Sequence, residues 1–325
     1  MQVIILTGGL GRRPKNIDND WPVSMISIIN KPFVEYILED LSNNGIFNVI
    51  FALGYQGKII EQYFGDGNKW KMKIQYVYEK ELLGTVGVLK KACQLINGER
   101  VLVINGDTYC QLDYKQFIDF GKTLDVAIML RNVENSSGYE GVLRAEKNVI
   151  NYGEKALLSD SQLINGGIYC IKVLLLNEMP EENVSLENDI MSDWIKRKKK
   201  IGRMVSDGYF VDMAVPEDYK KFVADIQMRN QSQMKYVTQQ LECLLEQSVT
   251  AASTSLTNWK YEMRLCLKQV YGVKSLQYEE FEKIDFEPES LVRTKDCREY
   301  MAHFCHKKLK YIKRRMKDAG FYARN

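Results

Sequence analysis

The chain has 325 residues, 45% of them hydrophobic and 27% charged, so it can bury a substantial core and can hold one large domain beside a smaller one. Its 45 lysines and arginines and 42 aspartates and glutamates nearly balance, which leaves a formal charge of +3. This balance excludes a nucleic-acid binder that depends on a strong overall positive field.

Short apolar runs recur along the first half of the chain, and segments with helical spacing, such as Phe33, Ile37, Leu38 and Leu41, separate them. The alternation predicts a Rossmann-like α/β fold, with a mostly parallel sheet and helices on both of its faces. In such sheets, ligands bind beyond the carboxyl ends of the strands. The expected strands are Val3–Leu6, Val49–Leu53, Ile74–Val77, Val101–Asn105 and Val126–Leu130.

A glycine-rich turn, Leu6-Thr7-Gly8-Gly9-Leu10-Gly11, directly follows the first expected strand. Glycines at such a place let backbone N–H groups approach a polyphosphate without a Cβ in the way. Arg12, Arg13 and Lys15 then add positive charge. A tight connection between a strand and a helix uses the same residues, so the turn alone leaves phosphate binding and a purely structural role equally open.

Two carboxylates follow apolar runs that lie far apart in the sequence. Asp107 comes just after Val101–Asn105, and Asp212 ends the run Tyr209-Phe210-Val211. Two aspartates from separate strand ends can share one hard cation, which would neutralise charge as a phosphoryl group is displaced. Each aspartate could also be a helix N-cap or a turn residue.

The pattern changes near residue 217, after which apolar side chains keep three-and-four spacing without strand-like runs. This predicts an all-α C-terminal extension, with a first domain over residues 1–227 and a helical domain of unknown role over 228–325. The apolar stripe Met234–Leu245 favours core packing or a homo-oligomer formed through the helical tail.

Cysteine usage and the absence of long apolar runs bear on the compartment. The seven cysteines are odd in number and never form a CxxC pair, and no run is long enough to cross a bilayer, so we expect a cytoplasmic protein with reduced thiols. The cluster of cysteines and histidines over Cys297–His306 matches no common zinc module. The basic run Lys307–Lys317 could contact nucleic acid or acidic lipid, but such runs are more often solvated helix faces, so we expect no nucleic-acid partner.

Several motifs, taken in chain order, resemble those of sugar-1-phosphate nucleotidyltransferases. The resemblance covers about residues 1–225, and the joint order of its pieces makes it specific although each piece is weak. Lys31–Tyr36, Tyr63–Gly67, Asn105–Tyr109 and Ser185–Glu187 look most like heptose-1-phosphate guanylyltransferases. The family motifs are Leu6–Gly11, Asn30–Phe33, Leu83–Thr85, Asn105–Asp107, Glu154–Lys155, Ile164–Gly167 and Asp212–Tyr219.

The resemblance implies a sheet of the nucleotide-diphospho-sugar transferase type and an enzyme of nucleotide-sugar biosynthesis. A sugar 1-phosphate oxygen would attack the α-phosphorus of a nucleoside triphosphate in line, with no covalent enzyme intermediate, and pyrophosphate would leave. Such catalysis needs carboxylates that hold Mg²⁺, cations that face phosphates, and backbone amides.

The family pattern also implies roles for individual residues. Asp107 and Asp212 would hold Mg²⁺, Gly84 and Thr85 would face the base, and Asn165 would hold sugar hydroxyls. The implied catalytic residues are Arg13, Lys15, Asp107, Lys155 and Asp212. The implied nucleotide-binding residues are Leu6, Gly8, Gly9, Gly11, Arg12, Gly84, Thr85 and Gly106. The implied sugar-phosphate-binding residues are Gly141, Glu154, Lys155 and Asn165.

One departure from the family pattern affects catalysis. The family's Pro-Lys-Pro-Met motif reads Pro22-Val23-Ser24-Met25 in this chain, so Val23 replaces a lysine that touches the reacting phosphates. Either Lys15 or Arg12 compensates, or catalysis is weakened or lost. One alternative is therefore a catalytically weakened sensor of a nucleotide or sugar nucleotide. Another is an enzyme that makes a nucleotide signal, because the helical tail faintly resembles a module of defence proteins.

Overall fold

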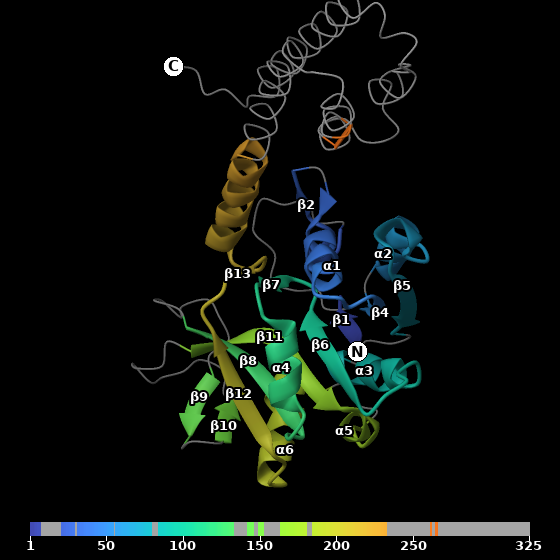
Figure 1. Ribbon diagram of the computed structural model, residues 1–325. Coiled ribbons are helices and arrows are strands. Elements are labelled where there is room, and N and C mark those ends of the chain that lie inside the picture. Colours follow the sequence, from blue (N-terminus) through green and yellow to red (C-terminus); the bar gives the residue numbers. More distant parts are fainter. Residues whose placement is uncertain are drawn as a thin grey trace, which may run out of the picture. The chain divides into compact units, whose positions relative to one another are not determined.

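The computed structural model describes residues 1–7, 21–29, 31–54, 56–79, 84–132, 142–145, 149–152, 163–180, 184–232, 261 and 264–265, with the backbone alone at 84, 142–145 and 149–152. The chain forms two compact units, Met1–Val223 and Ala224–Asn325. The first unit contains every element that Figure 1 labels.

The first unit alternates strands and helices. Its strands are β1 (Gln2–Leu6), β2 (Ser27–Ile28), β3 (Lys31–Pro32), β4 (Asn48–Leu53), β5 (Lys73–Tyr78), β6 (Arg100–Asn105), β7 (Thr108–Cys110), β8 (Val126–Asn132), β9 (Val142–Ala145), β10 (Val149–Tyr152), β11 (Leu163–Lys172), β12 (Ile201–Ser206) and β13 (Phe210–Asp212). Its helices are α1 (Phe33–Asn43), α2 (Gly57–Phe64), α3 (Gly84–Cys93), α4 (Tyr114–Gly121), α5 (Val173–Asn177) and α6 (Met191–Lys196). Short helical turns are η1 (Val23–Met25), η2 (Asn68–Trp70) and η3 (Leu186–Ile190).

A seven-stranded sheet with the order β12-β8-β11-β6-β1-β4-β5 forms the centre of the unit (Figure 1). Neighbouring strands are parallel except at β11, which runs antiparallel to both β6 and β8. Each of the five strands expected from apolar runs lies within an observed strand, so the prediction of a mostly parallel α/β sheet is confirmed.

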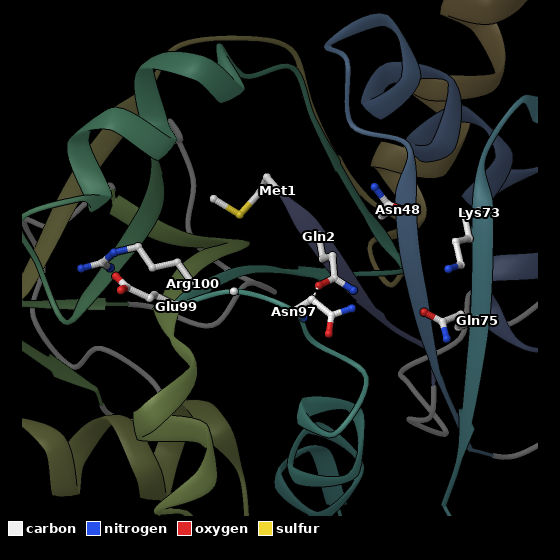
Figure 2. A pocket seen from close by; sticks show the side chains of 9 residues that line it. Met1, Gln2, Asn48, Lys73, Gln75, Asn97, Glu99 and Arg100 are labelled. Atoms are coloured by element: carbon white, nitrogen blue, oxygen red, sulfur yellow. Dashed lines mark hydrogen bonds between the residues drawn. The ribbon is translucent and has the colours of Figure 1, made fainter.

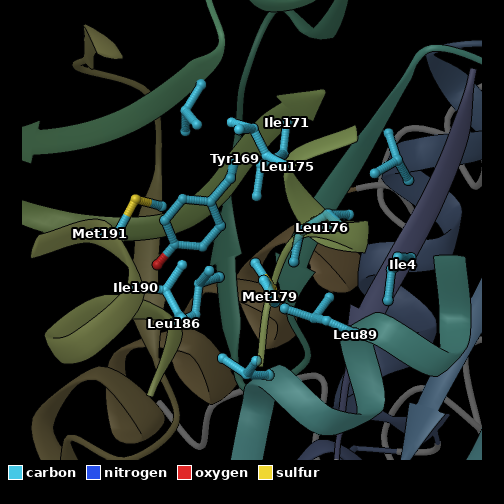
Figure 3. Packing of buried hydrophobic residues seen from close by; sticks show 14 of the residues in the cluster. Ile4, Leu89, Tyr169, Ile171, Leu175, Leu176, Met179, Leu186, Ile190 and Met191 are labelled. Carbon is cyan, nitrogen blue, oxygen red and sulfur yellow. The ribbon is translucent and has the colours of Figure 1, made fainter. Parts of the chain in front are cut away.

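Helices cover both faces of the sheet, as the sequence predicts. On one face, α3, α5, η3 and α6 pack against a continuous buried cluster of strand residues, which Figure 3 shows around Tyr169. On the other face, the ring of Phe64 from α2 stacks on Phe51 of β4 with 5.5 Å between centroids. A Cβ at Gly121 of α4 would lie 3.0 Å from the Cys170 sulfur of β11, so α4 also packs closely on this second face.

A further helix covers residues 216–232, at the place where the apolar side chains take up helical spacing. Its Phe222 packs edge-on against Phe33 and Tyr36, with ring centroids 5.4 and 5.2 Å apart. The Met234–Leu245 stripe, the Cys297–His306 cluster and the Lys307–Lys317 run lie outside the described residues. Within the described ranges, no helix combines the length and apolarity that crossing a membrane requires.

Candidate functional site

The carboxyl ends of β1 and β6 lie side by side and bring two predicted nucleotide-binding residues together. Leu6 pairs with Asn105, and the Gly106 N–H donates to the Leu6 carbonyl at 2.8 Å. A Cβ at Gly106 would lie 2.7 Å from Cγ2 of Thr7 and 2.8 Å from the Leu6 oxygen, so this close approach requires glycine. The described beginning of the glycine-rich turn therefore lies against the turn that carries Asp107.

The two predicted metal-binding aspartates are brought together by a small antiparallel ladder of β7 and β13. Asp212 lies opposite Thr108 in this ladder, and the Met213 N–H donates to the Asp107 carbonyl at 2.9 Å. The Thr108 hydroxyl donates to Oδ1 of Asp107 at 3.3 Å. Residues more than 100 positions apart in the chain thus have adjacent backbones at one edge of the sheet.

Local hydrogen bonds hold the Asp212 segment. Its Oδ1 accepts from the Ala214 N–H at 2.8 Å, which is an Asx turn. Its backbone N–H donates to Oδ2 of Asp218, in the first turn of the 216–232 helix, at 2.9 Å. Asp218 lies within the Asp212–Tyr219 motif, but the sequence does not indicate this role, since the contact depends on how that helix meets β13.

The donor chemistry of Asp107 and Asp212 suits a hard divalent cation, which prefers carboxylate oxygens. In the described part of the chain, no group of three or more histidine, cysteine, aspartate or glutamate side chains is arranged to hold a metal. A cation held by this pair would therefore take its other oxygen ligands from phosphates and water, as is usual where a metal is bound with a phosphorylated substrate.

Asn165 lies at the same edge of the sheet because β11 is antiparallel to its neighbours. The first residues of β11 are therefore next to the carboxyl ends of β6 and β8. The pairing with β8 shifts between Asn165 and Tyr169, and Gly167 within this irregularity has a φ of +71°. A Cβ at Gly167 would lie 3.0 Å from the Asn105 side chain, which places this stretch directly against the end of β6.

Thr85, which is expected to face the base, is hydrogen-bonded in the structure to the segment that begins at Leu186. Its Oγ1 accepts the Leu186 N–H at 3.0 Å, and the residue lies in the first turn of α3. Leu186 begins η3, and the next residue is the buried Glu187, which is 9% exposed. Glu187 is linked by hydrogen bonds to Asn165 through Tyr169. Glu187 belongs to one of the family motifs, but no local pattern indicates this link, because Asn165 and Glu187 are 22 positions apart on separate elements.

Val23, which replaces the family lysine, lies in η1 and is 5% exposed. It is packed as a core side chain together with Met25, which is 2% exposed. Arg12 and Lys15, the predicted compensating cations, lie outside the described residues. So do the predicted Gly8, Gly9, Gly11, Arg13, Gly141, Glu154 and Lys155.

A polar hollow of about 550 Å³ lies at the opposite edge of the sheet, where β1, β4, β5 and β6 begin (Figure 2). Gln2 forms part of its wall and accepts the Asn97 N–H at 2.6 Å while donating to the Leu95 carbonyl at 3.0 Å. Those predicted site residues that the structure describes lie toward the carboxyl ends of the strands, so the hollow is separate from them. It is lined by Met1, Gln2, Asn48, Lys73, Gln75, Asn97, Gly98, Glu99 and Arg100.

Comparison with known proteins finds matches over about the first 230 residues of the chain. The family model described as nucleotidyl transferase matches residues 2–229. A D-glycero-alpha-D-manno-heptose 1-phosphate guanylyltransferase of Aneurinibacillus thermoaerophilus is 36% identical over 231 residues, which are 70% of this chain and 99% of that protein. A protein of the same name from Campylobacter jejuni is also 36% identical, over 69% of this chain and 99% of its own length. The crystal structure of HddC from Yersinia pseudotuberculosis complexed with GMP-PN matches with a TM-score of 0.63 and 32% identity, over 69% of this chain and 99% of that one.

Proposed function

The chain belongs to the nucleotidyl transferase family, and from this premise we propose that it transfers a guanylyl group from GTP to a heptose 1-phosphate. It is an enzyme that joins the nucleotidyl group of a triphosphate to a sugar 1-phosphate and releases pyrophosphate. The choice of guanine and heptose is supported by the names of the two relatives that are 36% identical and by their near-complete coverage.

The single observation that carries the catalytic proposal is the adjacency of Asp107 and Asp212 across β7 and β13. Members of this family generally use a divalent metal, and we propose Mg²⁺, held by these two carboxylates. When bound, it would neutralise the charge that develops on the phosphates as the α-phosphorus is attacked. The hydrogen bonds from Ala214 and Thr108 restrain the two carboxylates, which supports this proposal.

The remaining catalytic work is positioning and charge neutralisation by the chain itself. We propose that the glycine-rich turn presents backbone N–H groups to the triphosphate and that Arg13 faces it. Lys155 is proposed to hold the sugar phosphate, and Asn165 with Glu154 the sugar hydroxyls. Holding the attacking oxygen in line with the leaving pyrophosphate would then account for most of the rate.

A non-catalytic sensor is not favoured, because the relatives with 36% identity are both named as guanylyltransferases and align with nearly their whole length. The proposed compartment is the cytoplasm, which supplies triphosphates and keeps thiols reduced. We also propose a homo-oligomer that forms through the helical tail, residues 228–325.

Pyrophosphate release tests the proposed function. The full chain would be assayed with each of the common nucleoside triphosphates against heptose, mannose and glucose 1-phosphates, with Mg²⁺ and with EDTA. We expect the highest kcat/KM for GTP with a heptose 1-phosphate, and loss of turnover in EDTA. Turnover with another pair at a higher kcat/KM would overturn the substrate assignment, and no turnover with any pair would overturn the proposed activity.

A further inference from the structure

A directed chain of hydrogen bonds runs from the sugar side of the site into the core. The Gly167 N–H donates to Oδ1 of Asn165 at 3.0 Å, and Nδ2 of Asn165 donates to the Tyr169 hydroxyl at 2.5 Å. The Tyr169 hydroxyl donates to Oε1 of Glu187 at 3.0 Å, and the Ser185 hydroxyl donates to Oε2 at 3.2 Å. Every bond in the chain therefore has one defined donor.

The side chains in this series of hydrogen bonds lie among apolar residues, where packing alone does not require polar groups. Tyr169 has no exposed surface, and Figure 3 shows its hydroxyl directed toward the side of Leu186 and Ile190. Glu187 is 9% exposed, and burying a carboxylate is costly unless it is well hydrogen-bonded. A phenylalanine in place of Tyr169 and an apolar residue in place of Glu187 would fill the same space without that cost. The polar pair therefore has a role other than filling space.

The donor-to-acceptor direction of these hydrogen bonds follows from the chemistry of a carboxylate. A carboxylate accepts hydrogen bonds and does not donate them, so the Tyr169 hydrogen points at Glu187. The Tyr169 oxygen is then an acceptor toward Asn165, which fixes the amide with Nδ2 on that side. One amide hydrogen and one lone pair of the Asn165 oxygen lie outside these two bonds, and a sugar hydroxyl can match both, since it donates and accepts.

The segment that carries Glu187 is itself held in place from the nucleotide side. Ser185 accepts the Asn188 N–H at 3.2 Å, and Oδ2 of Asp189 accepts the Ser185 N–H at 2.7 Å, which is a reciprocal cap on η3. The Leu186 N–H donates to Thr85 of α3 at 3.0 Å. One short segment thus connects the first turn of α3 with the sugar-side strand β11.

We propose that Glu187 is a positioning residue that acts through Tyr169 to fix how Asn165 presents its amide, and thereby contributes to the selection of the sugar. The inference rests on the proposed function, which assigns Asn165 to the sugar hydroxyls. Glu187 does not touch the substrate. Its role is to hold the Tyr169 oxygen as an acceptor for Nδ2 of Asn165, while the Gly167 N–H holds Oδ1, so that both ends of the amide are fixed.

Glu187→Gln is the direct test, because glutamine keeps the volume but replaces the carboxylate that accepts from Tyr169 with a neutral amide, a weaker acceptor that can also donate. We expect the KM for the sugar 1-phosphate to rise about tenfold, the loss expected when one hydrogen bond to the substrate is weakened. The KM for GTP should stay within about twofold, and the ratio of kcat/KM between heptose and mannose 1-phosphates should fall. Binding of the sugar 1-phosphate, measured by calorimetry, should weaken in parallel.

Two further variants separate a directional role from a merely structural one. Tyr169→Phe breaks the same chain, so it should raise the same KM, and the double variant should be no worse than the poorer single variant. Tyr169→Phe also carries the test if Glu187→Gln does not fold. Glu178→Gln is the matched control, because Glu178 pairs with Arg197 and Lys199 on the surface and should leave both KM values unchanged.

The outcomes distinguish the two proposals. If the wild-type chain turns over a sugar 1-phosphate and Glu187→Gln and Tyr169→Phe match Glu178→Gln in KM, calorimetric affinity and sugar preference, the positioning role is wrong and the proposed function stands. Equal rises in the KM for GTP and for the sugar phosphate would also overturn it, since they indicate general distortion. If the wild-type chain neither binds nor turns over any sugar 1-phosphate, both proposals fail.

Discussion

At the scale of single residues, Asp107 and Asp212 are the side chains on which catalysis should depend most. We expect Asp107→Asn and Asp212→Asn each to lower kcat on the order of 100-fold or more, because one charge that balances the transferring phosphates is lost. The amide oxygen that Asp212→Asn introduces could still accept the Ala214 N–H, so thermal melting should change little. Asp207→Asn, at a side chain that is 91% exposed, is the control in the same pyrophosphate assay. Near wild-type rates in both site variants would refute the metal assignment.

The burial of Val23 bears on which cation replaces the family lysine. Because Val23 is packed in the core at 5% exposure, Val23→Lys would bring a charge into an apolar place and should lower Tm. We therefore expect Arg12→Ala or Lys15→Ala to depress turnover, with Val23→Lys giving no gain in rate. Initial rates of nucleotide-sugar formation measure all three variants. A faster Val23→Lys enzyme, or full activity in both alanine variants, would contradict compensation by the glycine-rich turn.

Asp40 on α1 should make stability depend on pH. Burial raises the pKa of Asp40 from 3.8 to about 6, although a hydrogen bond from the Tyr114 hydroxyl opposes part of that rise. Between these two pH values the unfolded chain loses the proton and the folded chain keeps it, so this group's contribution to stability falls as pH rises and is lowest above 6. Asp40→Asn should therefore raise Tm relative to wild type at pH 7.5, and the gain should shrink toward pH 4.

A matched control for that comparison is Asp119→Asn. Asp119 is exposed on α4, and a hydrogen bond from Lys122 lowers its pKa, so replacing it removes a favourable interaction instead of a buried charge. Melting curves over the same pH range should show no gain for this variant at pH 7.5. An equal gain in both variants would indicate a general effect of net charge and would contradict the role assigned to Asp40.

At the scale of elements, the contact between the ends of β1 and β6 depends on Gly106. A methyl group there would meet the Leu6 carbonyl at 2.8 Å, and backbone cannot move aside as a flexible side chain can. We expect Gly106→Ala to cost about 1–3 kcal/mol in urea unfolding and to weaken binding of the triphosphate. At Gly98 the nearest atom would be 3.8 Å away, so Gly98→Ala should stay within about 0.5 kcal/mol. Equal stabilities for the two variants would refute this account.

The parts of the fold that follow from local pattern could be predicted, and the parts that depend on long-range pairing could not. The runs at β1, β4, β6 and β8 are buried on both faces and read as continuous apolar segments, whereas the edge strand β5 is mostly half-buried. The reversed direction of β11 has no local signal, because parallel and antiparallel central strands share the same composition.

The same division holds for the candidate site. Asp107 and Asp212 could be proposed because each follows an apolar run, and the structure brings their backbones together. The chain from Asn165 to Glu187 could not, since it requires the register of β11 and the position of η3 at once. The proposed roles of the residues outside the described ranges stay predictions.

At the scale of the whole molecule, the first unit should fold by itself. Phe222, near the end of the first unit, packs on Phe33 and Tyr36, so the start of the 216–232 helix contributes to the packing of that unit. We expect residues 1–232 to show one cooperative thermal transition and to retain turnover with GTP and a heptose 1-phosphate. Calorimetry and the pyrophosphate assay measure both properties. A truncated protein without a cooperative transition would overturn the predicted boundary.

The position of β11 in the sheet has a consequence for the folding of the chain during translation. In the sheet order, β8 has β12 and β11 as neighbours, and both are translated after it. While the ribosome extends the chain from residue 132 to 163, the apolar strand β8 has both edges open, and β6 has one. Open apolar edges invite pairing with other chains, so this interval is when the nascent protein is most exposed to aggregation. Emergence of β11 closes the edge of β6 and one edge of β8 in a single step.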